Sequence, residues 1–199
     1  MKILVTGGAG FIGSHIADAC IATGHAVAII DNLSMGKREN INARSTFYQL
    51  DIRDAAVGEI FRKERFDAIF HLAAQMDVRK SVEDPMFDAS VNILGTINLL
   101  QQCKATGVKK FVFASTGGAI YGEQDSFPAD ESHPLRPLSP YGITKLAVEK
   151  YLFYYREVFG LNYVALRFAN IYGPRQNPHG EAGVVAIFTS NMLAGEQPT

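Results

Sequence analysis

Short apolar runs alternate with longer amphipathic stretches along the chain. In most of these runs the residues are apolar at every position, without alternation of apolar and polar residues, and many are β-branched or aromatic. Continuous runs of this kind are typical of parallel strands that helices cover on both faces. The predicted strands span residues 3–5, 27–30, 47–50, 68–70, 111–113 and 163–166.

Helical periodicity fills the segments between these runs. Gly24, Gly107 and Gly160 follow three of the predicted helices, at the position where glycine commonly ends a helix. The strict alternation of strand and helix predicts an α/β fold with a doubly wound parallel sheet. The predicted helices span residues 12–23, 54–64, 85–106, 140–159 and 184–193.

Composition sets the broad class of protein. Of the 199 residues, 47% are hydrophobic and 20% are charged, which is ordinary for a globular chain with a substantial core. The net charge of −1 gives no electrostatic reason to expect a nucleic acid or an anionic membrane as partner. The apolar start of the chain stops at residues 6–8, and no later stretch approaches the roughly 18 apolar residues of a membrane span.

The cysteines and histidines indicate neither redox nor metal chemistry. Cys20 and Cys103 are isolated within predicted helices and are expected to be buried thiols in a reducing compartment, so we predict a cytoplasmic protein. The histidines are scattered without metal-ligand spacing, so no metal site is predicted. His71 closes a predicted strand and is interpreted as a hydrogen-bonded structural residue rather than a catalyst.

The segment VTGGAGFIGS, residues 5–14, directly follows the first predicted strand. Gly7, Gly10 and Gly13 have the spacing of a loop that turns tightly, lets its backbone approach a pyrophosphate and packs a helix on a strand. The helix that follows offers free N–H groups and a partial positive charge. A tight strand–helix turn is the alternative explanation, but Asp31 at the end of the next strand favours dinucleotide binding.

Two acidic residues are candidates for the adenosine half of a dinucleotide. Asp31 is expected to accept hydrogen bonds from the ribose hydroxyls and to repel a 2′-phosphate, which favours NAD over NADP. Lys37 and Arg38 lie close enough in sequence to keep NADP as a second option. Asp51 could receive the adenine amino group or could cap a helix beside Asp54, and the spacing does not choose between these roles.

The segment SPYGITK, residues 139–145, places Tyr141 and Lys145 on one face of a helix. A tyrosine acts as a base near pH 7 only after its pKa falls from about 10, which requires roughly 4 kcal/mol. An ammonium at about 4 Å supplies roughly 1–4 kcal/mol, and the positive nicotinamide of NAD would add to it. A half-buried tyrosine packed on a lysine stem is the structural alternative. Ser115 and Thr116, which follow the fifth predicted strand, add hydroxyls that such a site could use.

These motifs together resemble the extended short-chain dehydrogenase/reductase family, and within it the UDP-glucose 4-epimerase branch. The resemblance implies a Rossmann-type NAD-binding domain over residues 1–172. It also implies that residues 173–199 begin a substrate-binding region whose remainder is absent from this chain. The segments that carry the resemblance are TGGAGFIGS (6–14), DNLSMG (31–36), DI (51–52), HLAAQ (71–75), ASTGGAIYG (114–122), YGITK (141–145) and RFANIYGPRQ (167–176).

The resemblance also implies roles for single residues. Thr116 matches the hydroxyl that bonds the reacting sugar oxygen, Tyr141 matches the acid–base, and Lys145 matches its partner. Asn170 matches a residue that holds the diphosphate of the nucleotide sugar. Met76 is a departure, because some epimerases have a lysine there, near the nicotinamide. The implied NAD contacts are Gly7, Gly10, Phe11, Ile12, Gly13, Asp31, Asn32, Leu33, Ser34, Gly36, Asp51, Ile52, Leu72, Ala73, Ala74, Gln75, Asn92, Tyr141 and Lys145, with Ser115 either structural or facing the cofactor.

The implied reaction is reversible inversion at C4 of a UDP-hexose, UDP-glucose or UDP-galactose, through a transient 4-keto sugar. The rival enzymes are nucleotide-sugar 4,6-dehydratases and UDP-glucuronate decarboxylases, which carry acidic residues directly after the threonine. This chain has Gly117 and Gly118 there. A catalytically silent NAD-binding sensor is a further alternative, although such proteins commonly lose the tyrosine or the lysine. The resemblance also implies a homodimer, in which the helices at 85–106 and 140–159 pair across a two-fold axis.

Overall fold

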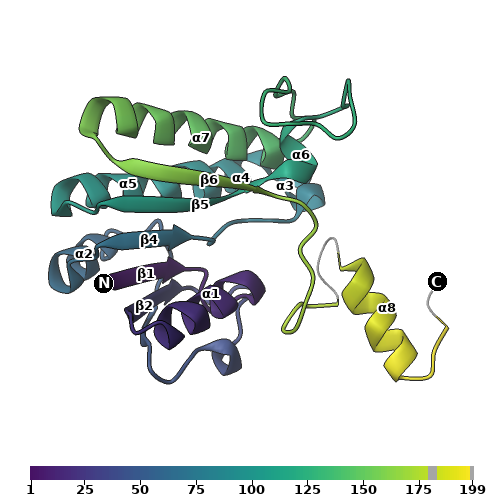
Figure 1. Ribbon diagram of the computed structural model, residues 1–199, viewed down its shortest axis with the longest axis horizontal. Helices are drawn as coiled ribbons and strands as arrows, with labels where there is room; N and C mark the ends of the chain where they lie inside the picture. The colour runs from purple at the N-terminus through teal and green to yellow at the C-terminus, as the bar shows by residue number, and fades with distance from the viewer. Residues whose placement is uncertain (179–182, 198–199) are drawn as a thin grey trace.

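The computed structural model describes residues 1–178 and 183–197. Within these ranges, six strands form one parallel sheet in the order β3-β2-β1-β4-β5-β6, which confirms the predicted α/β class (Figure 1). Each predicted strand is present and is extended or shifted by a few residues at most. The strands span Lys2–Thr6 (β1), Ala26–Asp31 (β2), Thr46–Gln49 (β3), Ala68–His71 (β4), Lys110–Thr116 (β5) and Asn162–Phe168 (β6).

The helices follow the predicted periodicity with three differences. The helix predicted over 85–106 is present without a break, but a π-helical segment, Ser90–Leu94, widens the turn between Pro85–Ala89 (α4) and Gly95–Thr106 (α5). The helix predicted from residue 54 begins at Val57, because turns occupy the residues before it. Two short helices, α3 and α6, lack a predicted counterpart because so few residues show no periodicity. The α-helices span Phe11–Ala22 (α1), Val57–Glu64 (α2), Val78–Glu83 (α3), Pro85–Ala89 (α4), Gly95–Thr106 (α5), Gly117–Ile120 (α6), Pro140–Phe159 (α7) and Val184–Leu193 (α8), and a 3₁₀ turn spans Arg38–Asn40.

Glycines end the two long helices as predicted. Gly107 and Gly160 adopt left-handed conformations with φ of 75° and 72° directly after α5 and α7. Gly24 has φ of 85° but lies one residue beyond the cap of α1, which is Thr23. Within the described residues, no helix combines the length and the apolar character needed to cross a membrane.

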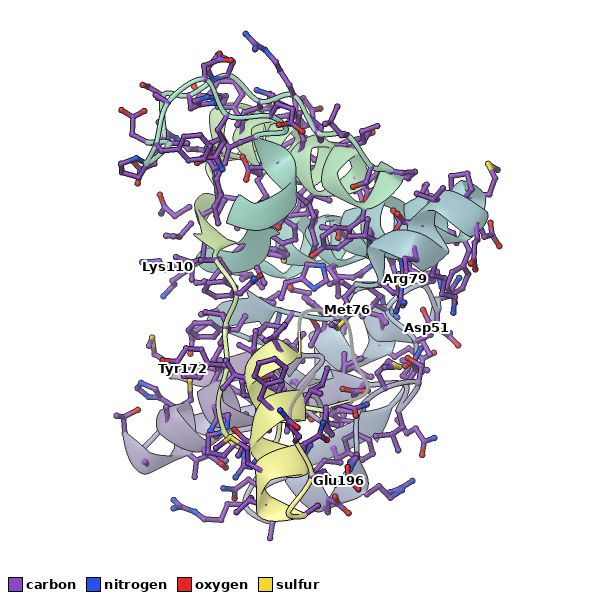
Figure 2. The ribbon with its side chains drawn as sticks, turned by 90° about the vertical axis from the view of Figure 1, so that its right-hand side faces the viewer. Asp51, Met76, Arg79, Lys110, Tyr172 and Glu196 are labelled. Atoms are coloured by element: carbon purple, nitrogen blue, oxygen red, sulfur yellow. The ribbon has the colours of Figure 1, made fainter. Side chains whose placement is uncertain are left out.

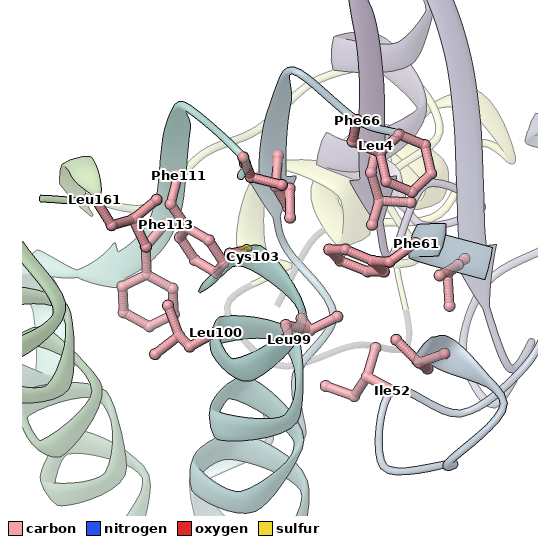
Figure 3. Close-up of a cluster of buried hydrophobic side chains, with 14 of the residues drawn as sticks. Leu4, Ile52, Phe61, Phe66, Leu99, Leu100, Cys103, Phe111, Phe113 and Leu161 are labelled. Atoms are coloured by element: carbon pink, nitrogen blue, oxygen red, sulfur yellow. The ribbon is translucent and has the colours of Figure 1, made fainter. Parts of the chain in front are cut away.

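The two faces of the sheet build two separate cores. Leu4 of β1 belongs to the larger core under α2, α5 and α7, whereas its neighbours Ile3 and Val5 pack against α1. The rings of Phe61 and Phe111 are wholly buried in the larger core beside α5 (Figure 3). Each such side chain contributes about 2–3 kcal/mol through its removal from water, so this core fixes α5 and α7 firmly on the sheet.

Strand β6 contradicts the expectation that the strands are covered on both faces. Val164 and Leu166 are 37% and 38% exposed, whereas Tyr163 and Ala165 pack against the larger core. The reason is that α1 packs against β1 and β2 on the opposite face, at the other side of the sheet from β6. The strand therefore has the alternating exposure of a strand with one covered face.

The carboxyl ends of the six strands meet at one edge of the sheet, at the right of Figure 1. The order of the strands reverses between β1 and β4, so the segments that follow these two strands diverge. Open α/β sheets bind ligands at such a point. The glycine-rich loop after β1, the HLAAQ segment after β4 and the hydroxyls that end β5 all lie along this edge.

Candidate functional site

The glycine-rich loop after β1 has a geometry that only glycine permits. Gly7 has φ of 71°, and a Cβ there would lie 2.7 Å from the backbone nitrogen of Ala73. A Cβ at Gly13 would lie 2.2 Å from the carbonyl oxygen of Gly7. Helix α1 starts at Phe11 without a side-chain cap, so its first N–H groups point to the edge of the sheet without a side-chain acceptor. The loop is therefore a cradle of backbone N–H groups, as an anion site requires.

The segment after β2 folds over this cradle. The buried carboxylate of Asp31 accepts hydrogen bonds from the backbone N–H groups of Ala9 at 3.0 Å and Leu33 at 2.8 Å. Gly36 completes the turn, where a Cβ would lie 2.8 Å from the Cβ of Ala9. These bonds fix the orientation of the carboxylate and leave lone pairs on both oxygens. The predicted ribose contact of Asp31 stays a prediction, with Asn32 and Ser34 exposed beside it.

Asp51 lies at the same edge, after β3 (Figure 2). The alternative that it caps a helix is wrong, because α2 begins at Val57 and Ala56 occupies its cap position. The carboxylate instead accepts bonds from the Arg53 side chain at 2.8 and 2.9 Å and from Asn32 at 3.0 Å. The hydrogen bonds from Arg53 lower the pKa of Asp51 to about 2, although burial opposes the shift. The predicted contact with adenine, bracketed by the buried Ile52, is not tested by these bonds.

His71 ends β4 as a structural residue, as predicted. It is buried, with Nδ1 2.7 Å from the Thr6 hydroxyl and Nε2 2.8 Å from the Thr96 hydroxyl. Thr96 donates its own proton to the carbonyl oxygen of Asn92 at 2.6 Å, so it accepts from Nε2–H and leaves Nδ1 to accept from Thr6. Burial, with the positive charge of Lys145, lowers the pKa of His71 to about 3. The imidazole is therefore neutral near pH 7.

The HLAAQ segment continues from β4 toward α3. Leu72, Ala73 and Ala74 are partly exposed, and Met76 is 47% exposed at the centre of this edge in Figure 2. Gln75 is buried, where its backbone N–H donates to Asn92 at 2.9 Å and its carbonyl oxygen accepts from Asn92 at 3.0 Å. Asn92 lies in the π-helical segment. The structure thus brings together Gln75 and Asn92, two of the residues predicted to contact the cofactor.

A buried carboxylate that the sequence analysis missed ties these residues to α7. Asp88 of α4 accepts hydrogen bonds from Gln75 at 2.9 Å, Asn92 at 3.1 Å and the hydroxyl of Thr144 at 2.8 Å. Its side chain is wholly buried. The sequence did contain a signal for this contact. Asp88 lies four residues before Asn92, a predicted cofactor contact, so both residues were expected on the same face of the helix.

Tyr141 and Lys145 stand one turn apart on α7, as their spacing predicts. The Lys145 ammonium donates to the carbonyl oxygen of Ala114 at 2.9 Å and lies 4.8 Å from the Phe113 ring centre. It also lies 5.6 Å from the ring centre of Tyr141. Burial lowers the pKa of Lys145 to about 8, and the carboxylate of Asp88 opposes the shift. An ammonium held between β5 and the tyrosine can lower the cost of a phenolate there.

The hydroxyls that end β5 point to different partners. Thr116 accepts a hydrogen bond from the N–H of Ala119 at 3.2 Å and so caps α6. The first turn of α7 packs on that helix, because a Cβ at Gly142 would lie 2.5 Å from the Ala119 oxygen. Thr116 and Tyr141 therefore belong to adjoining turns. The roles of these residues toward a substrate remain predictions.

Ser115 donates to the Glu149 carboxylate at 2.6 Å, which shows a structural role for its hydroxyl. Glu149 also accepts two hydrogen bonds from Arg167 of β6, at 3.1 and 2.8 Å. Arg167 in turn donates to the hydroxyl of Tyr121 at 3.0 Å. This chain of contacts, which the sequence analysis missed, joins β5, β6 and α7 at the end of β5. A contact between Ser115 and a cofactor stays a prediction.

A groove opens between α6, β6 and α7 at the end of β5. Gly118 lines the groove, and nothing lies within 4 Å of the position that a Cβ would take there. Asn170, an exposed residue that follows β6, also lines the groove. Gly117 is tighter, since a Cβ there would lie 3.1 Å from the carbonyl oxygen of Arg167. The structure therefore brings Asn170 near the strand end that carries Thr116.

The loop after β6 returns to α1. The ring of His15 bonds the carbonyl oxygen of Pro174 at 2.9 Å, and Arg175 forms an ion pair with Asp18 at 2.8 Å. His179, one of the scattered histidines, lies outside the described residues. Among the residues that the structure does describe, no group of three or more acidic, histidine or cysteine side chains is placed to hold a metal ion.

The comparison with protein families decides the classification. The NAD dependent epimerase/dehydratase family matches residues 3–199 of this chain. The chain belongs to this family. Among curated members, it is 48% identical over 196 residues to a putative UDP-glucose 4-epimerase of Methanocaldococcus jannaschii and 46% identical over 200 residues to the UDP-glucose 4-epimerase of Mycolicibacterium smegmatis. Each match covers 98% of this chain and 64% of the relative, so the chain spans a little under two thirds of their length.

Solved structures of family members have the same fold. The UDP-glucose 4-epimerase of Thermus thermophilus, in complex with NAD, is 54% identical with a TM-score of 0.94. The UDP-glucose 4-epimerase of Thermotoga maritima, with UDP-glucose, is 53% identical with a TM-score of 0.96. Both comparisons cover 98% of this chain and 64% of the solved chain.

Proposed function

We propose that the full-length protein inverts C4 of a UDP-hexose, with NAD as a tightly bound cofactor and a 4-keto sugar as the transient intermediate. The observation that carries the proposal is the buried Lys145, held between Ala114 of β5 and the ring of Tyr141. The ammonium would stabilise the phenolate form of Tyr141, so that Tyr141 can take and return a proton at a single sugar oxygen. Relatives that are 46–54% identical to this chain over the aligned residues are named for the same reaction.

The residues at the sheet edge fit NAD. Backbone N–H groups line the glycine-rich loop, which passes so close to the segment after β4 that a Cβ at Gly7 would lie 2.7 Å from the backbone nitrogen of Ala73. Helix α1 begins at this loop with a helix N-terminus for the diphosphate. The carboxylate of Asp31, held by Ala9 and Leu33, would accept from the ribose hydroxyls and disfavour a 2′-phosphate. Lys37, which kept NADP open, forms an ion pair with Glu39. Bound NAD would supply the hydride acceptor and, after the sugar turns, the hydride donor.

The chain's own side chains would move the proton. Tyr141, as a phenolate near Lys145, takes the proton of the C4 hydroxyl, and Thr116 holds that oxygen by a hydrogen bond. Loss of hydride from C4 gives the 4-keto sugar. Return of the hydride to the other face, with the proton from Tyr141, gives the inverted alcohol. One acid–base and one hydroxyl suffice because no carbon–oxygen or carbon–carbon bond breaks. We place Asn170 at the diphosphate of the substrate.

The rival reactions need an acid at positions where this chain has glycine. A 4,6-dehydratase must protonate the hydroxyl that leaves C6, and its relatives carry acidic residues where this chain has Gly117 and Gly118. Space does not explain the glycine at 118, because nothing lies within 4 Å of the position of its absent Cβ. A carboxylate would therefore fit at position 118, and its absence there favours epimerisation.

We further propose that two copies associate through α7. Exposed side chains on this helix form a stripe at helical spacing, in which Tyr151, Tyr154 and Val158 are 39%, 47% and 55% exposed. Leu94, which ends the π-helical segment before α5, is 61% exposed. Apolar surface of this kind is buried in dimer interfaces, and a second copy would supply a matching stripe across a two-fold axis.

Two wider assignments belong to the same proposal. We assign residues 1–172 to the NAD-binding domain and residues 173–199 to the beginning of the substrate-binding region. We also place the protein in the cytoplasm and in galactose metabolism. The unpaired, buried thiols of Cys20 and Cys103 suit a reducing compartment.

The deciding experiment incubates the full-length protein separately with UDP-galactose, UDP-N-acetylgalactosamine and dTDP-glucose. Formation of UDP-glucose from UDP-galactose without added NAD is expected. The second substrate is a fair alternative, because one similar structure is described as a UDP-N-acetylglucosamine 4-epimerase. Accumulation of a stable 4-keto-6-deoxy sugar from dTDP-glucose would replace the proposal with dehydration, and bound NAD with no turnover of any sugar would favour the silent sensor.

A further inference from the structure

Asp88 is a buried carboxylate that is held by neutral donors. Its side chain is wholly buried, and no ion pair among the described residues includes it. Three side chains donate to it instead, one from each of three segments that surround the predicted reaction centre. Burying a carboxylate costs free energy because the charge loses its hydration, unless hydrogen bonds and a nearby positive charge compensate for the loss.

The donors to Asp88 are the side chains that hold the predicted cofactor segment to α7. Gln75 and Asn92 donate to Oδ1 at 2.9 and 3.1 Å, and Thr144 donates to Oδ2 at 2.8 Å. Thr144 directly precedes Lys145 and lies on the turn that begins with Tyr141. The carboxylate therefore fixes the first turn of α7 relative to α4 and to the segment after β4.

The charge of Asp88 also acts on Lys145. Burial disfavours the ammonium and lowers the pKa of Lys145 to about 8, whereas the carboxylate of Asp88 shifts it upward. At neutral pH the charged form of this lysine therefore depends on a balance between dehydration and one buried negative charge.

The other groups that face Lys145 do not provide a free negative charge. His71 of β4 is neutral, since its pKa is lowered to about 3, and β5 presents a carbonyl oxygen and a phenyl ring. Glu149, one turn farther along α7, is paired with Arg167 of β6 at 2.8 Å. Tyr141 is the group that the ammonium is proposed to serve.

We propose that Asp88 is a positioning residue that keeps Lys145 in its ammonium form and fixes the turn of α7 that carries Tyr141. The inference rests on the proposed function, because it gives the reason why that lysine must be charged. Asp88 touches neither the sugar nor the nicotinamide in this proposal. It acts through Lys145 and Thr144.

The test is the Asp88→Asn variant of the full-length protein. The introduced amide has nearly the same shape as the carboxylate. Its oxygen can accept from Gln75 and Asn92, and its amino group can donate to Thr144, whose proton can turn to the carbonyl oxygen of Tyr141, 2.9 Å away. Asp84→Asn is the matched control, because Asp84 is an exposed residue that caps the same helix by accepting from Phe87 at 2.9 Å.

Two readouts separate the charge of Asp88 from its structural role. In Asp88→Asn, the pH above which kcat/KM falls is expected to move down by about one unit, with little loss at pH 6.5. An NMR titration of ¹³Cε-labelled Lys145, assigned with Lys145→Arg, should show a lower pKa than in the parent and in Asp84→Asn. This titration does not depend on epimerase activity.

The outcomes are distinct. An unchanged Lys145 titration in Asp88→Asn, or an equal loss of activity at every pH, would overturn the positioning role and leave Asp88 as a packing residue. If the parent protein turns over no UDP-sugar, the proposed function fails, while the NMR shift still reports whether Asp88 controls the charge of Lys145.

Discussion

The ammonium of Lys145 lies 5.6 Å from the ring centre of Tyr141, one helical turn away, and is anchored to the Ala114 carbonyl oxygen at 2.9 Å. The anchor holds the positive charge in place while leaving it close to the phenol. Because the lysine is removed from water, the interaction between its charge and the phenol is stronger than at a surface. Several consequences of this geometry can be measured.

Replacing Tyr141 by phenylalanine should abolish turnover and leave the cofactor bound. Loss of the proton-transferring hydroxyl is expected to lower kcat by about 10²–10⁴-fold. The measurement is conversion of UDP-galactose, together with the NAD released on denaturation. Tyr151→Phe is the control, because Tyr151 is exposed on the same helix and should retain activity. Unchanged turnover in Tyr141→Phe would remove this residue from the mechanism.

Activity should fall as the pH rises through about 8, the pKa of Lys145. Burial sets this value below that of a free lysine, so the ammonium loses its proton while the rest of the protein is still folded. The kcat/KM measured from pH 6 to pH 10 is the test. Lys145→Met should lose most of the activity and the alkaline decline with it. A decline at the same pH in this variant would assign it to another group.

His71 makes stability fall with decreasing pH. Its pKa is about 3 in the fold, below the ordinary value of 6.5, so the unfolded state binds more protons between these pH values. Its contribution is complete above pH 6.5 and is lost toward pH 3. The free energy of unfolding, measured with urea, should decrease by about 2–3 kcal/mol between pH 6.5 and 4.5.

The variants for this measurement are His71→Gln and the control His15→Gln. His71→Gln is less stable than the parent at pH 7, because it loses two buried hydrogen bonds, yet its stability should vary less with pH. His15 is exposed, so its replacement should keep the slope of the parent. An equal slope in His71→Gln and in the parent would show that the imidazole is not neutral in the fold.

Gly7→Ala should cost both stability and cofactor, because the new Cβ would lie 2.7 Å from the backbone nitrogen of Ala73. Gly24→Ala is matched in backbone conformation, with φ of 85° against 71°, but has nothing within 4 Å of its Cβ. The control should lose about 1–2 kcal/mol through strain alone. Gly7→Ala should lose about 1–3 kcal/mol more and should purify without NAD. Equal losses and retained NAD in the two variants would contradict the cradle.

A charge on the exposed stripe of α7 should separate the proposed dimer. The double variant Tyr154→Glu and Val158→Glu places two carboxylates in the apolar interface, where they lose hydration without a partner. Light scattering during gel filtration should then give half the mass of the parent. Lys150→Glu, an exposed change on the same helix, should leave the mass unchanged. A parent that is monomeric at micromolar concentration would refute the dimer directly.

Much of the site was accessible from sequence because its motifs are local. Gly7, Gly10 and Gly13 lie within one loop, and Tyr141 and Lys145 lie within one turn, so spacing alone places them relative to each other. Parallel strands then bring the ends of β1, β4 and β5 to one edge, which is a rule of the fold class. The short helices α3 and α6 escaped prediction because segments of six and four residues carry no measurable periodicity.

By itself, the sequence determined the order of strands and helices, the glycines that end α5 and α7, and the kinds of side chain at the carboxyl edge of the sheet. These features depend on residues that are close together along the chain, through their periodicity and their backbone conformation. The tertiary structure alone decided which polar groups form hydrogen bonds and which charges lie close together. Asp88 and Lys145 are far apart in sequence, as are Ser115 and Glu149, and only the packing of α4 on α7 and of α7 on β5 joins them. Long-range packing sets dehydration, and dehydration decides that His71 is neutral and that Lys145 loses its proton near pH 8.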